Sequence, residues 1–294
     1  MKILTAIAVG DALGKFYANH TPTEDVGDIK VYLQKPTGSY NYLRSIDYTP
    51  YTRFMRIMLE AYNDFFLNNY NPSQVSLSYI VKSGFKSNYM KLGNLIPVTT
   101  DTMLVMFGNH IVMEDLSLPM KVSPLYDDYI PRDSFLPILT VLSTLHIPTR
   151  HRTTGLLNEL DKSFIRFPSD LVMLQRIVFY HMLRLERGKF DGIDDFCKQF
   201  ITSLADVGKS RSKFTLDKVL RCLLFNSIEI EDNLEAYLAK FVEENRFDFY
   251  IDLHTGIMLL TVFWANLFPK KSFPTKYRDI NKFKELAEID EVSF

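Results

Sequence analysis

Apolar residues recur at helical spacing through most of the chain. The first such pattern holds Ile3, Leu4, Ile7 and Ala8, and Asp11 follows one turn after Ile7. The same period predicts helices over residues 54–65, 73–82, 134–146, 170–187, 192–206, 215–226, 231–244 and 252–268, with a further helical piece near 281–289. Residues 21–50 are rich in Pro, Gly, Tyr and Asp, which predicts loops with a short hairpin near residues 35–38.

The pattern contains no internal repeat, low-complexity tract or linker that would divide the chain. It therefore predicts an all-α single domain over residues 1–294, with β structure confined at most to the 21–50 region.

The stretch VGDALGKFYA, Val9 to Ala18, places an acid between two glycines four residues apart. Three small residues, Gly10, Ala12 and Gly14, would let another backbone approach closely. Each glycine inside a helix costs about 1 kcal/mol relative to Ala, so a packing reason is expected for them. The alternative is that Asp11 belongs to a chemical site, which would require partners elsewhere in the chain.

Composition narrows the classes of protein. The chain has 294 residues, 47% of them hydrophobic, and a formal net charge of -1, so it can build a large core and has no electrostatic footprint for nucleic acid or an acidic membrane. Cys197 and Cys222 form no C-x-x-C pair, which favours core positions and a reducing, cytoplasmic setting. The longest apolar run, Thr255 to Phe268, is 14 residues. A bilayer span takes about 20, so a buried helix is expected there.

Two further stretches carry candidate chemistry. PVTTDTML, Pro97 to Leu104, and FYIDLHTGIMLLTVFWANLFP, Phe249 to Pro269, each place Asp and Thr directly before an apolar helix. Asp252 and Thr255 are three residues apart and share one face at a helix start. Carboxylates and hydroxyls are hard oxygen donors suited to Mg²⁺, but the same residue types are also the usual helix N-caps. The sequence leaves both interpretations open.

Together the three stretches resemble the ADP-ribosylglycohydrolase family. That family carries G-D-A-L-G near its start, S/T-D-D-T before a second helix, and D-x-D-T/S near its end. Here the segments stand in the same order as Gly10-Asp11-Ala12-Leu13-Gly14, Thr99-Thr100-Asp101-Thr102 and Asp252-Leu253-His254-Thr255. The resemblance implies a single-domain orthogonal helical bundle of the ADP-ribosylglycohydrolase type, in which residues 20–95 form a longer intervening region than usual.

The resemblance also implies a site. In the family, hydroxyls and carboxylates hold two Mg²⁺ ions in a cleft that receives ADP-ribose, and the bond from ribose C1 to its partner is hydrolysed. Carried over by position, Asp101 and Asp252 would serve catalysis, and the metal positions would be Thr99, Asp101, Asp252, His254 and Thr255. Asp11 would lie beside the cleft on the substrate side, as an orienting or structural residue. Arg166, in IRFP, would face the phosphates.

Three positions depart from the family pattern. Thr100 and His254 stand where the family has Asp, and Ala18 stands where a glutamate commonly follows G-D-A-L-G. Two carboxylates are thereby lost from a cluster that must offset the charge of two cations. Mg²⁺ takes imidazole poorly, whereas Zn²⁺, Mn²⁺ or Fe²⁺ would accept His254. The site could hold one ion, another metal or none.

Three functions follow from these observations. The first is a metal-dependent hydrolase of ADP-ribosyl conjugates or related nucleotide-ribosides. The second is a catalytically impaired relative that binds ADP-ribose or an ADP-ribosylating protein and acts by occlusion. The third is a structural helical protein in which the three stretches are only caps and packing. ADP-ribose or an ADP-ribosylated protein is the expected partner of the first two, with no nucleic acid or membrane.

Overall fold

The computed structural model describes residues 3–14, 17, 52, 169–225, 234–271, 273 and 284. The chain divides into two compact units, Met1–Thr52 with Arg176–Ser293, and Arg53–Gln175 with Phe294. Every described helix belongs to the first unit, except that α8 begins in the second. The expected loops at 21–50 and the helices at 54–65, 73–82 and 134–146 lie outside the described residues, as does 281–289 apart from Lys284. A single domain over the whole length stays a prediction.

The described residues form helices and contain no strand, which agrees with the all-α prediction for this part of the chain. The helices are α1 Ile3–Gly14, α8 Ser169–Glu186, α9 Ile193–Ser203, α10 Arg211–Phe225, α11 Leu234–Asn245 and α12 Leu253–Leu267. Most bounds agree with the predicted ones within three residues. α10 begins four residues before the predicted start at 215, because Ser210 caps it by accepting a hydrogen bond from the Lys213 backbone N–H.

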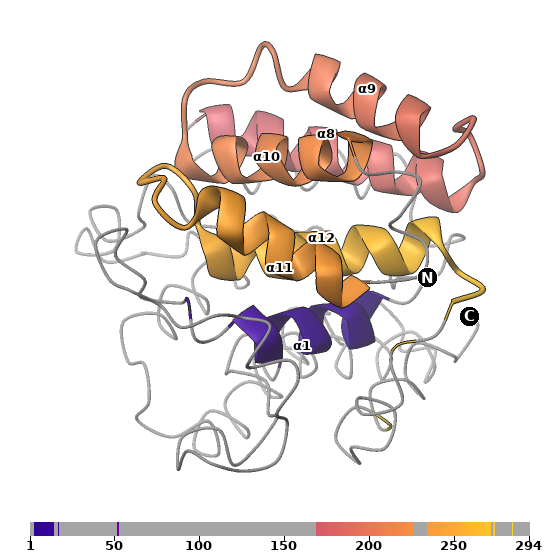
Figure 1. Cartoon of the computed structure of the whole chain (residues 1–294). Coiled ribbons are helices and arrows are strands. Elements are labelled where there is room, and N and C mark those ends of the chain that lie inside the picture. Colours follow the sequence, from indigo (N-terminus) through magenta and orange to yellow (C-terminus); the bar gives the residue numbers. More distant parts are fainter. Residues whose placement is uncertain are drawn as a thin grey trace, which may run out of the picture. The chain divides into compact units, whose positions relative to one another are not determined.

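Helix α12 is the centre of this unit. Its residues Leu253 to Ala265 are all buried, and it packs against α1, α10 and α11 (Figure 1). A helix that is apolar on every side is stable only when neighbours cover every side. The apolar run from Thr255 is therefore the buried helix that the sequence predicts. Among the described helices, none has the length and apolar character needed to span a bilayer.

The first helix, α1, lies directly against α12, and two glycines set the distance between them. A Cβ atom at Gly10 would lie 2.7 Å from the Cα of Met258, and one at Gly14 would lie 2.7 Å from Cδ2 of His254. Side chains at these positions would collide with the facing helix. The close backbone approach predicted from GDALG is thus confirmed at Gly10 and Gly14.

Helices α8 and α9 are joined through a buried histidine. His181 stacks on Phe200, with ring centroids 4.4 Å apart, and its Nε2 lies 3.0 Å from the Ser203 hydroxyl. That hydroxyl donates to the Gln199 carbonyl, so His181 donates through Nε2. Burial, with a smaller contribution from the Arg184 charge, lowers the pKa of His181 to about 4. The ring is therefore neutral at pH 7.

Both cysteines are buried thiols and do not form a disulfide, as the sequence predicts. Cys197 lies on α9 and Cys222 on α10, two helices that pack together. Burial raises the pKa of the Cys197 thiol to about 12, so the thiolate is not formed at neutral pH. Cys197 contributes to packing rather than to nucleophilic chemistry.

Candidate functional site

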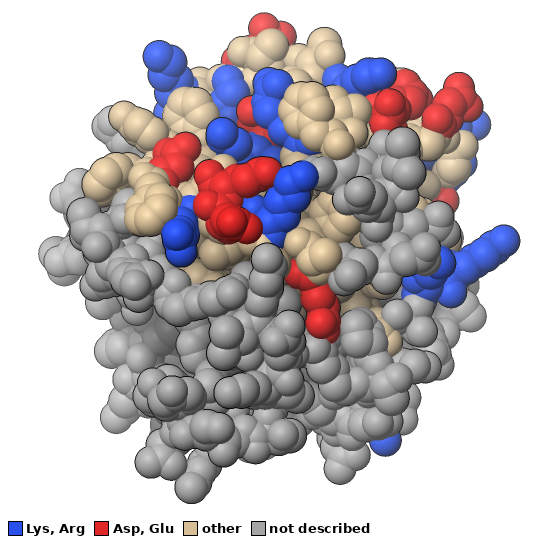
Figure 2. Space-filling view, in the orientation of Figure 1, with Lys and Arg blue, Asp and Glu red and all other residues tan. Residues whose placement is uncertain are grey.

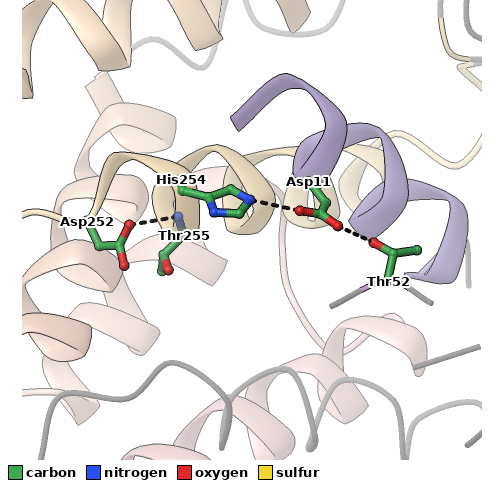
Figure 3. Close-up of polar contacts among 5 residues, drawn as sticks. All are labelled: Asp11, Thr52, Asp252, His254 and Thr255. Carbon is green, nitrogen blue, oxygen red and sulfur yellow. Dashed lines mark hydrogen bonds and ion pairs between the residues drawn. The ribbon is translucent and has the colours of Figure 1, made fainter. Parts of the chain in front are cut away.

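The first and third motif stretches meet through a buried hydrogen bond. His254 Nε2 lies 2.8 Å from Asp11 Oδ1, although the two residues are 243 positions apart (Figure 3). Since a carboxylate oxygen only accepts, His254 donates through Nε2. Asp11 is fully buried and His254 is 6% exposed. The contact therefore lies in the interior, between α1 and the first turn of α12.

The second carboxylate oxygen of Asp11 is also engaged. Thr52 donates a 2.7 Å hydrogen bond from Oγ1 to Asp11 Oδ2, and its side chain is fully buried (Figure 3). A buried carboxylate is costly unless its oxygens accept hydrogen bonds, and here each oxygen has a donor. Asp11 is thus held between His254 on one side and Thr52 on the other.

Asp252 caps α12. Its backbone is extended, and its Oδ1 accepts a 3.2 Å hydrogen bond from the Thr255 backbone N–H. The Thr215 hydroxyl on α10 accepts a 2.9 Å hydrogen bond from the Asp252 N–H, and the Arg211 guanidinium donates to the Ile251 carbonyl. The capping role that the sequence offered for Asp252 is therefore present.

Two oxygen donors at this helix start suit a hard cation. Asp252 Oδ2 and Thr255 Oγ1 make no hydrogen bond with any other described residue, and both side chains project from the first turn of α12 (Figure 3). A carboxylate and a hydroxyl are ligands of the type that Mg²⁺ takes. Within the described part of the chain, no three His, Cys, Asp or Glu residues gather as a metal site. A complete ligand set would need residues from elsewhere in the sequence.

His254 differs from these donors in its orientation. Its Nε2 is turned to Asp11, so while that bond persists a metal ion would have to be taken by Nδ1. The ring also lies against Gly14, whose missing side chain provides the space for it. The described residues thus present two hard oxygen donors, with the imidazole directed into the α1 contact.

The loop from α11 to α12 leads into this site and exposes aromatic rings. Phe247, Phe249 and Tyr250 are 64%, 67% and 67% exposed, and Asp252 follows two residues after Tyr250. The loop is ordered by its own hydrogen bonds, including one from the Tyr250 N–H to Asp248 Oδ1. Acidic and basic side chains are intermixed on the face shown in Figure 2. Tyr250 packs against Phe214, with ring centroids 5.5 Å apart, and the Arg246 guanidinium lies over the Phe247 ring, so part of this aromatic surface is already engaged within the protein. The exposed area that is left could stack on a planar ligand.

The site residues expected from the sequence are described only in part. Asp11, Asp252, His254 and Thr255 lie together at the contact of α1 with the start of α12. Thr99, Asp101 and Arg166 lie outside the described residues, as do Thr100 and Ala18. Sequence reasoning missed Thr52 and Thr215. Nothing in the sequence distinguishes these two threonines from threonines on the surface, so their hydrogen bonds to the site could not be predicted.

Comparison of the chain with protein-family models, with curated proteins and with solved structures gives no match.

Proposed function

We propose that this chain is an ADP-ribosylglycohydrolase-like protein that hydrolyses the glycosidic bond of ADP-ribosyl conjugates or related nucleotide-ribosides with a divalent cation. One observation carries the proposal. Asp11 of GDALG and His254 of the D-x-H-T stretch, 243 positions apart in the sequence, are hydrogen-bonded at 2.8 Å. Two stretches that each resemble a motif of one family therefore meet in space, and this convergence supports the proposal.

The roles of the residues follow from their chemistry. Asp252 and Thr255 offer a carboxylate and a hydroxyl oxygen at the start of α12, and we place Thr99 and Asp101 with them as further ligands. A divalent cation held there would lower the pKa of a water molecule and favour its attack at ribose C1. Asp11 would act by fixing the start of α12 through His254, and Arg166 would face the diphosphate.

The exposed rings of the α11–α12 loop suit the base of such a substrate. Phe247 and Phe249 are exposed in the loop that leads to Asp252, and we place the base of a nucleotide bound at the helix start on this aromatic surface. Stacking of a base on an aromatic side chain contributes about 1–3 kcal/mol. This contribution needs no metal ion.

A second function is favoured by the orientation of His254. The position where the family has a metal-binding carboxylate holds an imidazole that is hydrogen-bonded to Asp11. A relative with weakened metal binding would retain the cleft and the aromatic loop but lose turnover. Such a protein would bind ADP-ribose or an ADP-ribosylating protein and act by occlusion.

Release of ADP-ribose from an ADP-ribosylated protein tests the proposal. Wild type and Asp101→Ala are assayed side by side with Mg²⁺, with Mn²⁺ and with chelator, and ADP-ribose binding is measured by calorimetry in the same buffers. Turnover that needs a metal ion and Asp101 would support the hydrolase. Binding without turnover would select the occluding relative. Turnover unaffected by chelator would refute the metal-dependent reaction, and neither binding nor turnover would leave a structural helical protein.

A further inference from the structure

Among the described residues, the contact of His254 with Asp11 is shielded from solvent, and the polar atoms that form it are hydrogen-bonded. The imidazole is 6% exposed, the carboxylate is fully buried, and the two Asp11 oxygens are bonded to His254 and Thr52. Gly14 faces the ring, and a Cβ atom there would lie 2.7 Å from Cδ2 and 3.0 Å from the His254 carbonyl oxygen. The ring is therefore fixed in place by both its hydrogen bond and its packing.

An aspartate at position 254, as the family pattern has, would create a different situation. Its carboxylate would start from the same turn of α12 and lie near the buried Asp11 carboxylate. Two carboxylates that share a buried site repel each other unless a proton or a cation lies between them. An imidazole N–H instead donates directly to Asp11, and this arrangement needs no cation.

We propose that the Asp11–His254 hydrogen bond takes the place of one of the two divalent ions that the family resemblance implies. The residues at this position do not fit a two-magnesium centre, because His254 gives its Nε2–H to Asp11, Asp11 has both oxygens engaged, and Mg²⁺ takes the remaining imidazole nitrogen, Nδ1, poorly. His254 is then no metal ligand through either nitrogen, the packing of α1 on α12 is independent of metal, and Asp252 with Thr255 serves at most one ion. The comparison with a centre of two ions rests on the proposed function, whereas the Asp11–His254 contact does not.

His254→Asp tests this inference, with His254→Gln as the matched control, because a Gln amide nitrogen can reach the position of the imidazole Nε2. Thermal unfolding is followed in chelator and in Mg²⁺ or Mn²⁺ for the whole chain. Replacing the imidazole donor by a second carboxylate leaves two acids facing each other in a buried site, so we expect His254→Asp to lose about 10 °C in chelator and to regain most of this loss with metal. Wild type and His254→Gln, whose amide can still donate to Asp11, should change by far less between the two buffers.

The inference is overturned if His254→Asp is as stable as wild type in chelator, or if metal stabilises wild type as strongly as the variant. A second measurement applies even when His254→Asp does not fold. Calorimetric titration of Mn²⁺ should give at most one ion per chain, with the same affinity in wild type and His254→Gln. Two ions per chain, or a tenfold weaker affinity in His254→Gln, would refute it. No bound ion would support the inference while removing metal-dependent hydrolysis from the proposed function.

Discussion

Gly14 lies so close to His254 that a Cβ atom at position 14 would be 2.7 Å from Cδ2 of the His254 ring and 3.2 Å from the His254 Cα. The glycine thus serves the helix contact and the hydrogen bond to Asp11 at once. An added methyl group would push the ring away from Asp11 or separate α1 from α12.

Gly14→Ala should therefore destabilise the protein by about 2 kcal/mol, because overpacking outweighs the gain in helix propensity. Chemical denaturation measures the free energy of unfolding. Gly188→Ala is the comparison: its φ of +60° disfavours a side chain, but no atom lies within 4 Å of the added Cβ, so a loss of about 1 kcal/mol is expected. Equal stability of Gly14→Ala and wild type would contradict the packing described for α1 and α12.

The hydroxyl of Thr52 should stabilise the buried carboxylate. Thr52→Val removes the donor to Asp11 Oδ2 while keeping the shape of the side chain, and we expect a loss of about 2 kcal/mol. Thr52→Ser, which restores the hydroxyl, should recover much of it. In a double-mutant cycle with Asp11→Asn, the two substitutions should be non-additive. Additive effects would mean that Thr52 and Asp11 act separately.

Asp252 can be tested for its capping and metal-binding roles separately. Asp252→Asn keeps an oxygen that can accept from the Thr255 N–H, whereas Asp252→Ala removes it. We expect Asp252→Ala to lose about 1 kcal/mol of stability and Asp252→Asn to lose little. If Asp252 is also a ligand, both variants should bind Mn²⁺ more weakly in calorimetry. Unchanged Mn²⁺ affinity in both would leave Asp252 with the cap alone.

The lowered pKa of His181 predicts a loss of stability in acid. Below pH 6.5 the unfolded chain binds a proton at this histidine that the folded chain, with a pKa of about 4, does not bind. The contribution of His181 to the free energy of unfolding should therefore fall by up to about 3 kcal/mol as the pH decreases from 6.5 to 4. Below pH 4 this contribution should change no further. Denaturation at pH 7, 5.5 and 4 measures it. His181→Phe, which keeps a ring against Phe200, should show a shallower pH dependence.

The aromatic loop should contribute to ligand affinity. Phe249→Ala is expected to weaken ADP-ribose binding by about tenfold, since a stacked ring contributes about 1–3 kcal/mol. Phe225→Ala, which removes a ring that is 76% exposed at the end of α10, is the matched control and should leave affinity unchanged. Equal losses in both variants, or none in Phe249→Ala, would remove the loop from the binding site.

The local features of this chain followed from its sequence. The spacing of apolar residues predicted α12, and the three-residue separation of Asp252 and Thr255 predicted a shared helix start where Asp252 now accepts the Thr255 N–H. GDALG predicted a close helix approach. Each of these features depends either on interactions within one or two helical turns or on the absence of a side chain at a glycine. Residues that are close together in the sequence are enough to predict both kinds of feature.

The partners across the fold did not follow from the sequence. Asp11 was expected beside a cleft and His254 at a metal position, but nothing in either stretch indicated that they bond to each other, or that Thr52 completes the contact. The start of α10 also differs from the predicted one, because Ser210 caps a helix that begins four residues before the apolar pattern does. The positions of Thr99, Asp101 and Arg166 stay predictions. Among the described residues, the sequence by itself determined which segments are helical and which faces must be covered. Only the tertiary structure decided which polar group faces which, because a buried hydrogen bond between residues 243 positions apart depends on how the two helices pack.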